Sequence, residues 1–195
     1  MTIEVNEAAT AGLAHFMIDP RASRFTVQAF ATGILSAMGH NPKIGIRTFS
    51  GEVDFNPETS EGGAFRLTVQ SASLGVLDDI SSKDRRGMEQ MMRDDVLEAG
   101  KYPEIRYQAA TMTVSRVEGS LYSASLNGDL SLHGVTRSQP ITARIAMFGG
   151  MLRASGDFSL KQSDYQIKPV SIAGGALQVK DELKFSFEIV ARNQV

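Results

Sequence analysis

Short stretches in which apolar and polar residues alternate run through most of this chain, and they restrict it to a fold made of β-strands. Successive side chains of a strand point to opposite faces, so a period of two indicates strands with one buried face. Phe49 and Val53, for example, share a face that Ser50 does not. Eight strands are predicted, at 25–29, 44–55, 65–69, 105–109, 126–132, 141–147, 152–160 and 183–189.

Glycine-containing turn sequences separate the predicted strands. Gly149-Gly150 lies between two alternating runs and is the best single hairpin signal. Asn127-Gly128 instead falls inside a predicted strand, where it indicates a β-bulge. Eight short antiparallel strands in a chain of this length are typical of an up-and-down barrel or a two-sheet sandwich. The predicted fold class is therefore all-β.

One segment, 82–100, has helical periodicity. Ser81 or Ser82 can cap its start, Gly100 can end it, and Pro103 prevents it from resuming. Its apolar residues recur every three or four positions, at Met88, Met91, Met92, Val96 and Leu97. Methionine repacks around irregular shapes, so this stripe either fills the core or forms an adaptable lid over an apolar cavity.

Length and composition exclude several classes of protein. A chain of 195 residues is large enough for one domain with its own core. The absence of cysteine excludes disulfide scaffolds, cysteine-ligated metal sites and thiol nucleophiles. The formal net charge is -2 and no block of about five or six like charges occurs, so we expect no nucleic-acid partner.

The hydropathy of the chain argues against a membrane span, because no stretch approaches about 18 uninterrupted apolar residues. Near the N-terminus, Glu4 and Glu7 stand where a secretory signal has basic residues. We therefore expect a cytoplasmic protein, or a periplasmic one if the sequence is a trimmed mature form.

No catalytic or metal-binding motif emerges from the sequence. The three histidines, His15, His40 and His133, lack the spacing that places two imidazoles on one metal ion. Nucleophile elbows, phosphate-binding loops and dinucleotide fingerprints are also missing. The residues alone thus lead to a soluble barrel or sandwich with one helix, with no metal or catalytic group assigned.

Six segments taken in order resemble the YceI-like, polyisoprenoid-binding family of bacterial proteins. The resemblance begins at Phe16 and continues to the C-terminus. It is carried by FMIDPRASRFTV, GHNPKIGIRTFSGEVDF, KDRR followed by VLEAGKYPEIRY, NGDLSLHGVTRSQPI, GDFSLKQSDYQI and VKDELKFSFEIV.

This resemblance implies an eight-stranded antiparallel, extended lipocalin-like β-barrel with an amphipathic helix in a loop near one end. The barrel domain would span 16–195, after a poorly ordered N-terminal extension at 1–15. It also implies non-enzymatic binding, transport or storage of an apolar amphiphile in the barrel, with no required cofactor. The bound molecule would be a polyisoprenoid lipid or an isoprenoid quinone, and the resemblance makes a homodimer plausible.

Candidate ligand-binding residues follow from the helix stripe, the strand alternation and the expected mouth of the barrel. The apolar ones are Leu35, Met38, Ile44, Ile46, Phe49, Val53, Met88, Met91, Met92, Leu97, Met147 and Phe148. For a polar headgroup at the mouth the candidates are His40, Arg85 and Arg86, because a guanidinium can bind a phosphate with two hydrogen bonds.

Two alternative functions stay open at this point. One is an enzyme that uses the same barrel, with His40 or His133 as general acid or base on a hydrophobic substrate. The other is a structural or interaction module whose barrel is completely packed with side chains.

Overall fold

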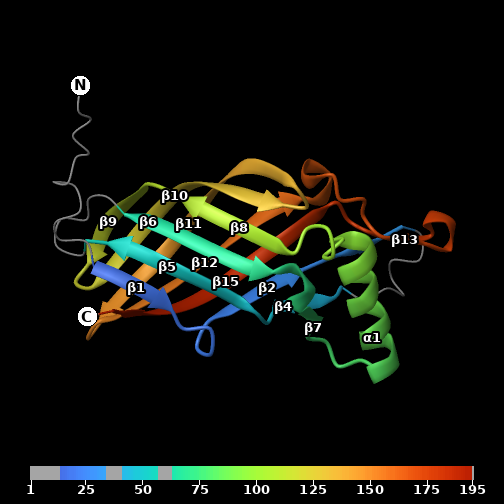
Figure 1. Cartoon of the computed structure of the whole chain (residues 1–195), viewed down its shortest axis with the longest axis horizontal. Helices are drawn as coiled ribbons and strands as arrows, with labels where there is room; N and C mark the ends of the chain where they lie inside the picture. Colours follow the sequence, from blue (N-terminus) through green and yellow to red (C-terminus); the bar gives the residue numbers. More distant parts are fainter. Residues whose placement is uncertain (1–13, 34–40, 57–62, 195) are drawn as a thin grey trace.

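A computed structural model of the chain describes residues 14–33, 41–56 and 63–194. The chain forms a closed eight-stranded antiparallel β-barrel (Figure 1). Neighbours in the barrel wall are also neighbours along the chain, as in an up-and-down barrel. Four barrel strands run unbroken: β10 (Leu121–Leu132), β11 (Val135–Phe148), β12 (Met151–Lys161) and β15 (Glu182–Asn193).

The other four barrel strands each consist of two segments. They are β1 (Ala14–Ile18) with β2 (Arg24–Gln28), β4 (Lys43–Ile46) with β5 (Phe49–Phe55), β6 (Ala64–Gln70) with β7 (Leu74–Val76), and β8 (Glu104–Ala109) with β9 (Met112–Glu118). The breaks in adjacent strands are coordinated. Arg47 NH, between β4 and β5, donates to the carbonyl of Ser73, which ends the short 3-10 turn η3 (Ser71–Ser73) between β6 and β7.

Closure of the wall decides between the two predicted architectures. β15 pairs with β1 in the register Phe16↔Asn193 and Ile18↔Ala191, and with β2 in the register Phe25↔Phe187. The first and last strands therefore complete a ring, which excludes the sandwich. The alternation had not shown β9 as a strand, and it had merged β4 with β5 into the single strand 44–55.

The turns confirm one local prediction and correct another. Gly149 and Gly150 join β11 to β12 with φ of 52° and 77°, which is the left-handed backbone of a tight hairpin. β10 itself carries no extra residue at Asn127-Gly128, because it keeps a continuous register with β11 there. The one-residue shift lies in the opposite neighbour, where β8 gives way to β9 between Asp129↔Gln108 and Leu126↔Met112. Gly128 instead makes room for a ring, since a Cβ there would lie 2.6 Å from Cζ of Tyr107.

The helix α1 (Ser82–Met91) begins where the sequence predicted and ends earlier. The Ser81 hydroxyl accepts from Asp84 NH as a cap. A π-helical turn, η4 (Met92–Val96), continues α1, and Glu98 then adopts φ of 44° and stops it. Ala99 NH donates back to the carbonyl of Arg93, as in other helix ends with a left-handed residue. The predicted end at Gly100 was therefore too late.

Elements outside the wall gather at one end of the barrel. α1 and the small sheet that contains β13 lie at this end, and the C-terminus lies at the other (Figure 1). The small sheet has the order β13 (Ser171–Ile172), β14 (Leu177–Val179), β3 (Ala31–Thr32). Two 3-10 turns, η5 (Gln162–Tyr165) and η6 (Ala173–Gly175), belong to the same excursion between β12 and β15.

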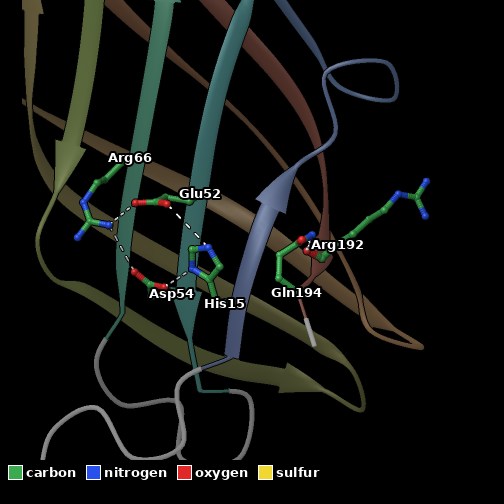
Figure 2. A network of polar contacts seen from close by, with 6 residues as sticks. All are labelled: His15, Glu52, Asp54, Arg66, Arg192 and Gln194. Carbon is green, nitrogen blue, oxygen red and sulfur yellow. Dashed lines mark hydrogen bonds and ion pairs between the residues drawn. The ribbon is translucent and has the colours of Figure 1, made fainter.

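A polar network ties β1 to the outer face of the wall, as Figure 2 shows. Nδ1 of His15 lies 2.8 Å from Asp54 Oδ1, and Nε2 lies 3.8 Å from Glu52 Oε2. Arg66 on β6 pairs with both carboxylates. β1 begins at Ala14, two residues before the predicted domain boundary. The His15 contacts therefore join β1 to β5, while the Arg66 pairs join β6 to β5 and each contribute about 0–1 kcal/mol.

Candidate ligand-binding cavity

A cavity of about 480 Å³ occupies the barrel interior, a volume typical of small-molecule sites. Its wall is aliphatic and aromatic almost throughout. Among the described residues the polar members of the lining are Tyr107, Gln162, Gln178 and Ser186, and none of the lining residues is charged. The alternation of the strands produces this surface, because it sends every second side chain inward.

Small side chains leave the interior unfilled. Ala124 on β10 and Ala143 on β11 are paired in the sheet register, and both line the cavity. Ala154 on β12, paired with the lining residue Ile189, does the same. An eight-stranded barrel is just wide enough to be filled by side chains or to hold one slender ligand. Alanines at these inward positions leave space, so they favour a barrel that holds a slender ligand.

The cavity is closed at the end away from α1. Phe16 and Phe55 are 1% and 0% exposed, and neither lines the cavity. The ring of Phe55 meets Tyr122 edge-on, with centroids 5.7 Å apart. Arg116 in turn lies over the outer part of this cluster, 5.5 Å from the Tyr122 centroid. This end is a packed core, so it acts as the floor of the cavity.

The opposite end contains lining residues that are also exposed, which marks it as the mouth. Met88 and Met91 of α1 are 36% and 39% exposed, and Ile172 of β13 is 48% exposed. Along β12 the lining runs from Leu152 to Leu160, a distance of about 26 Å at about 3.3 Å per residue. The interior is therefore a long blind tunnel that α1 covers at its mouth.

Two of the polar groups in the wall, on Tyr107 and Gln162, are bonded within the protein. The Tyr107 hydroxyl donates to the carbonyl of Gln139 at 3.0 Å, and Gln162 Nε2 donates to the carbonyl of Lys180 at 3.0 Å. Burial raises the pKa of the Tyr107 hydroxyl to about 12. A ligand in the tunnel thus meets shape and apolar surface, with few directional contacts.

Most of the apolar residues predicted from the sequence lie in this wall. Those that line the cavity are Ile44, Ile46, Val53, Met88, Met91, Met92 and Leu97. The methionine stripe therefore faces the mouth of the tunnel, which favours the lid over the core filler. Leu35, Met38 and His40 lie outside the described residues.

Three other predicted residues do not line the cavity. Phe49 is buried, and its ring packs edge-on against Phe25 with centroids 4.8 Å apart. Met147 and Phe148 belong to the β11–β12 hairpin at the closed end, where Phe148 is 59% exposed. The alternation predicted the spacing of β11 correctly, but it could not show that Met147 and Phe148 lie beyond the closed end of the cavity.

The arginines predicted for a headgroup have other surroundings. Arg85 donates to the backbone carbonyls of Val76 and Asp78, the second at 2.7 Å, so it anchors α1 to the end of β7. Arg86 is exposed on α1, and it is not among the lining residues. Neither guanidinium lines the cavity.

His133, the other catalytic candidate, lies at the β10–β11 turn and does not line the cavity. Its Nε2 lies 2.6 Å from Glu98 Oε2, and its Nδ1 lies 3.2 Å from the carbonyl oxygen of Tyr165. Both ring nitrogens are therefore engaged by groups of the protein itself.

Sequence reasoning missed much of the wall on the C-terminal strands. Phe158 on β12 and Phe185 on β15 line the tunnel as a stacked pair, with centroids 4.9 Å apart. Leu126 and Leu130 on β10 line it as well. The alternation had placed these residues on shared faces, but only the pairing of the strands tells which face points inward.

Comparison with known families agrees with this architecture. Residues 16–191 match the YceI-like domain. The chain belongs to the YceI-like domain family. Among curated proteins no sequence match is found.

Solved structures show the same fold at low sequence identity. Burkholderia cenocepacia BcnA is 19% identical, with a TM-score of 0.68 over 89% of this chain and 98% of its own. A polyisoprenoid binding domain from Saccharophagus degradans is 14% identical, with a TM-score of 0.68 over 93% and 99%. The YceI protein of Campylobacter jejuni is 19% identical, with a TM-score of 0.58 over 80% and 87%. In the described part of this YceI-like chain, no helix has the length and apolar character needed to cross a bilayer.

Proposed function

We propose that this YceI-like protein is a non-enzymatic carrier that binds an apolar amphiphile of isoprenoid type, a polyprenyl lipid or an isoprenoid quinone, inside its barrel. The observation that carries the proposal is the long, uncharged tunnel of about 480 Å³ with a methionine-lined helix at its mouth. The structural neighbour from Saccharophagus degradans, described as a polyisoprenoid binding domain, supports the same class of ligand.

Apolar contact alone can supply the affinity. Burial of one methylene group contributes about 0.8 kcal/mol, so about ten buried carbons give roughly 8 kcal/mol before the entropic cost of binding. A net free energy of about 8 kcal/mol corresponds to a micromolar dissociation constant, so a ligand must bury more than about ten carbons to reach that affinity once the entropic cost is subtracted. A longer chain that fills more of the tunnel binds more tightly, which suits a ligand built from repeated apolar units.

A carrier also fits the positions of the histidines in the described part of the chain. His15 lies on the outer wall with Asp54, and both ring nitrogens of His133 contact other protein groups. Neither imidazole lines the tunnel. A general acid or base must reach the reacting atoms of its substrate, so these two residues give no support to catalysis.

The test is to extract the purified protein with organic solvent, analyse the extract by mass spectrometry, and titrate the emptied protein with a fluorescent polyprenyl probe. We expect a long-chain apolar amphiphile in the extract and saturable uptake of the probe. Leu130→Asn, which places an amide in the tunnel wall, should weaken uptake strongly. Asp129→Asn, its exposed neighbour on β10, is the matched control. A clean extract together with no uptake of probe would overturn the proposal.

A further inference from the structure

His133 contacts two segments that cover the mouth of the tunnel: the helical segment α1–η4 and the 3-10 turn η5. It occupies the tight turn between β10 and β11 with φ of 52°, followed by Gly134 with φ of 75°. Its side chain is 10% exposed. Nε2 lies 2.6 Å from Glu98 Oε2, and Nδ1 lies 3.2 Å from the carbonyl oxygen of Tyr165. One imidazole therefore joins two segments that are distant from each other in the sequence.

The first of these segments is the cover formed by α1 and η4. Glu98 directly follows its last turn, and the Glu98 carbonyl accepts from the backbone NH groups of Lys101 and Tyr102. The Tyr102 ring packs against the His133 ring with centroids 4.5 Å apart. A Cβ at Gly134 would come within 2.6 Å of that tyrosine ring. The end of the helical cover is thus seated on the β10–β11 turn.

The second segment is η5, which follows β12 where this strand parts from β11. These two strands pair only from Arg144↔Ser155 to Phe148↔Met151, so the end of β12 near the mouth runs without β11 as a partner. η5 spans the resulting space. Arg137 Nε on β11 donates to the carbonyl of Asp164 at 2.5 Å, and the fully buried Tyr165 offers its carbonyl to His133.

The chemistry of the two partners determines the protonation of the ring. A backbone carbonyl and a carboxylate only accept hydrogen bonds, so each ring nitrogen must carry a hydrogen to satisfy both. This is the imidazolium form. A neutral imidazole has one N–H, so it can bond Glu98 or the Tyr165 carbonyl but not both. Glu98 is 44% exposed, which gives solvent protons access to the pair.

We infer that His133 is a protonation-controlled latch, which fastens the α1–η4 segment and η5 over the tunnel when charged and releases one of them when neutral. The role of the latch in ligand exchange rests on the proposed carrier function. The charged and titratable groups around the ring are Glu98, Lys101 and Tyr102 after η4, Asp164 and Tyr165 on η5, and Arg137 on β11. The state in which His133 holds both segments needs a hydrogen on each ring nitrogen, whereas the state in which one segment is released does not. A rise in pH therefore favours release.

The experiment measures the dissociation rate of a bound fluorescent polyprenyl probe by stopped flow from about pH 5 to about pH 8, the range in which histidine changes charge. In the unmodified protein, release should accelerate about tenfold or more as pH rises, since a hydrogen bond to a charged group is lost. His133→Ala should release the probe rapidly at every pH. His15→Ala is the matched control, because it removes a histidine paired with Asp54 on the outer wall.

Glu98→Gln separates the latch from a general effect of charge. The amide of glutamine can donate to a neutral Nε2, while Nδ1–H still donates to the Tyr165 carbonyl. This variant should therefore hold both covers with an uncharged ring, so that its release no longer accelerates with rising pH. Release that is independent of pH in the unmodified protein, or that follows the same pH profile in Glu98→Gln, would overturn the inference.

A second measurement tests the latch without any ligand. Amide hydrogen exchange of Leu97 and Ala99, whose NH groups bond back to Met92 and Arg93, reports opening of the cover. At one fixed pH, exchange at these amides should be about tenfold or more faster in His133→Ala than in His15→Ala. If no probe binds but this difference is present, the carrier proposal fails, and the fastening of the cover by His133 stands independently of it. Equal exchange in the two variants overturns the latch.

Discussion

Replacement of Ala143 by phenylalanine tests whether the barrel interior is a cavity that a ligand occupies. Ala143 is 5% exposed on β11, points into the tunnel, and is paired with Ala124 on β10. Two alanines side by side place little side-chain volume at this level of the wall. A benzyl group built here would extend into the tunnel between its mouth and its floor.

The expected magnitude follows from the carbon atoms that the new ring displaces. Phenylalanine has six more side-chain carbons than alanine. If these exclude six carbons of the ligand at about 0.8 kcal/mol each, binding loses roughly 5 kcal/mol, or more than a thousandfold in affinity. The free energy of unfolding of the emptied protein should rise or stay unchanged, because the ring fills empty space. In a packed core the same change would cost about 1–3 kcal/mol.

The assay combines titration with a fluorescent polyprenyl probe and thermal melting of the emptied protein. Ala109→Phe is the matched control, because Ala109 is 1% exposed, buried in the core and outside the tunnel lining. We expect the control to melt several degrees lower, at roughly 2–4 °C per kcal/mol. Ala143→Phe should melt normally and lose the probe. Unchanged affinity in Ala143→Phe, or destabilisation as large as that of Ala109→Phe, would refute the reasoning.

Three further predictions concern the parts that shape the tunnel. Gly128→Ala should lower the free energy of unfolding by about 1–3 kcal/mol in urea denaturation, because its Cβ would collide with the Tyr107 ring, and an unchanged midpoint would contradict that packing. Spectrophotometric titration should show a tyrosine that ionises near pH 12 and disappears in Tyr107→Phe. The pKa of Tyr107 in the folded protein lies above the usual value of about 10, so the stability that this hydroxyl contributes is complete below pH ~10 and is lost as the pH rises toward 12. Ionisation of Tyr107 near pH 10 would contradict its burial. Ser81→Ala should cost about 1 kcal/mol of helix stability and speed amide exchange in α1, while equal exchange rates would show that the cap has no effect.

Local patterns in the sequence predicted a large part of the fold. The period-two alternation located barrel strands such as β6 and β12, and the Gly149-Gly150 turn located the hairpin between β11 and β12. The methionine stripe located a helix with one apolar face. Each of these depends on residues that are neighbours along the chain, where propensity and periodicity act directly.

Other features of the structure depend on contacts between residues that are distant in the chain, which local patterns do not show. Gly128 resembled a bulge residue until Tyr107, on another strand, explained the missing side chain. Arg85, which the sequence placed at the mouth as a candidate for a headgroup, donates to the backbone at the end of β7. Glu98 ended the helix early in a left-handed conformation that local propensity gives to glycine.

The sequence by itself determined that this YceI-like chain has apolar-faced strands and one amphipathic helix, because the direction of each side chain follows from the local backbone. Only the tertiary structure decided that the strands close through β1 and β15, that Ala124 and Ala143 leave a tunnel, and that His133 meets Glu98 from 35 residues away. Strand register sets which face points inward, and a cavity is what remains when those faces are brought together. The register and the cavity both depend on contacts between residues that are far apart in the chain, and a local sequence pattern does not contain those contacts.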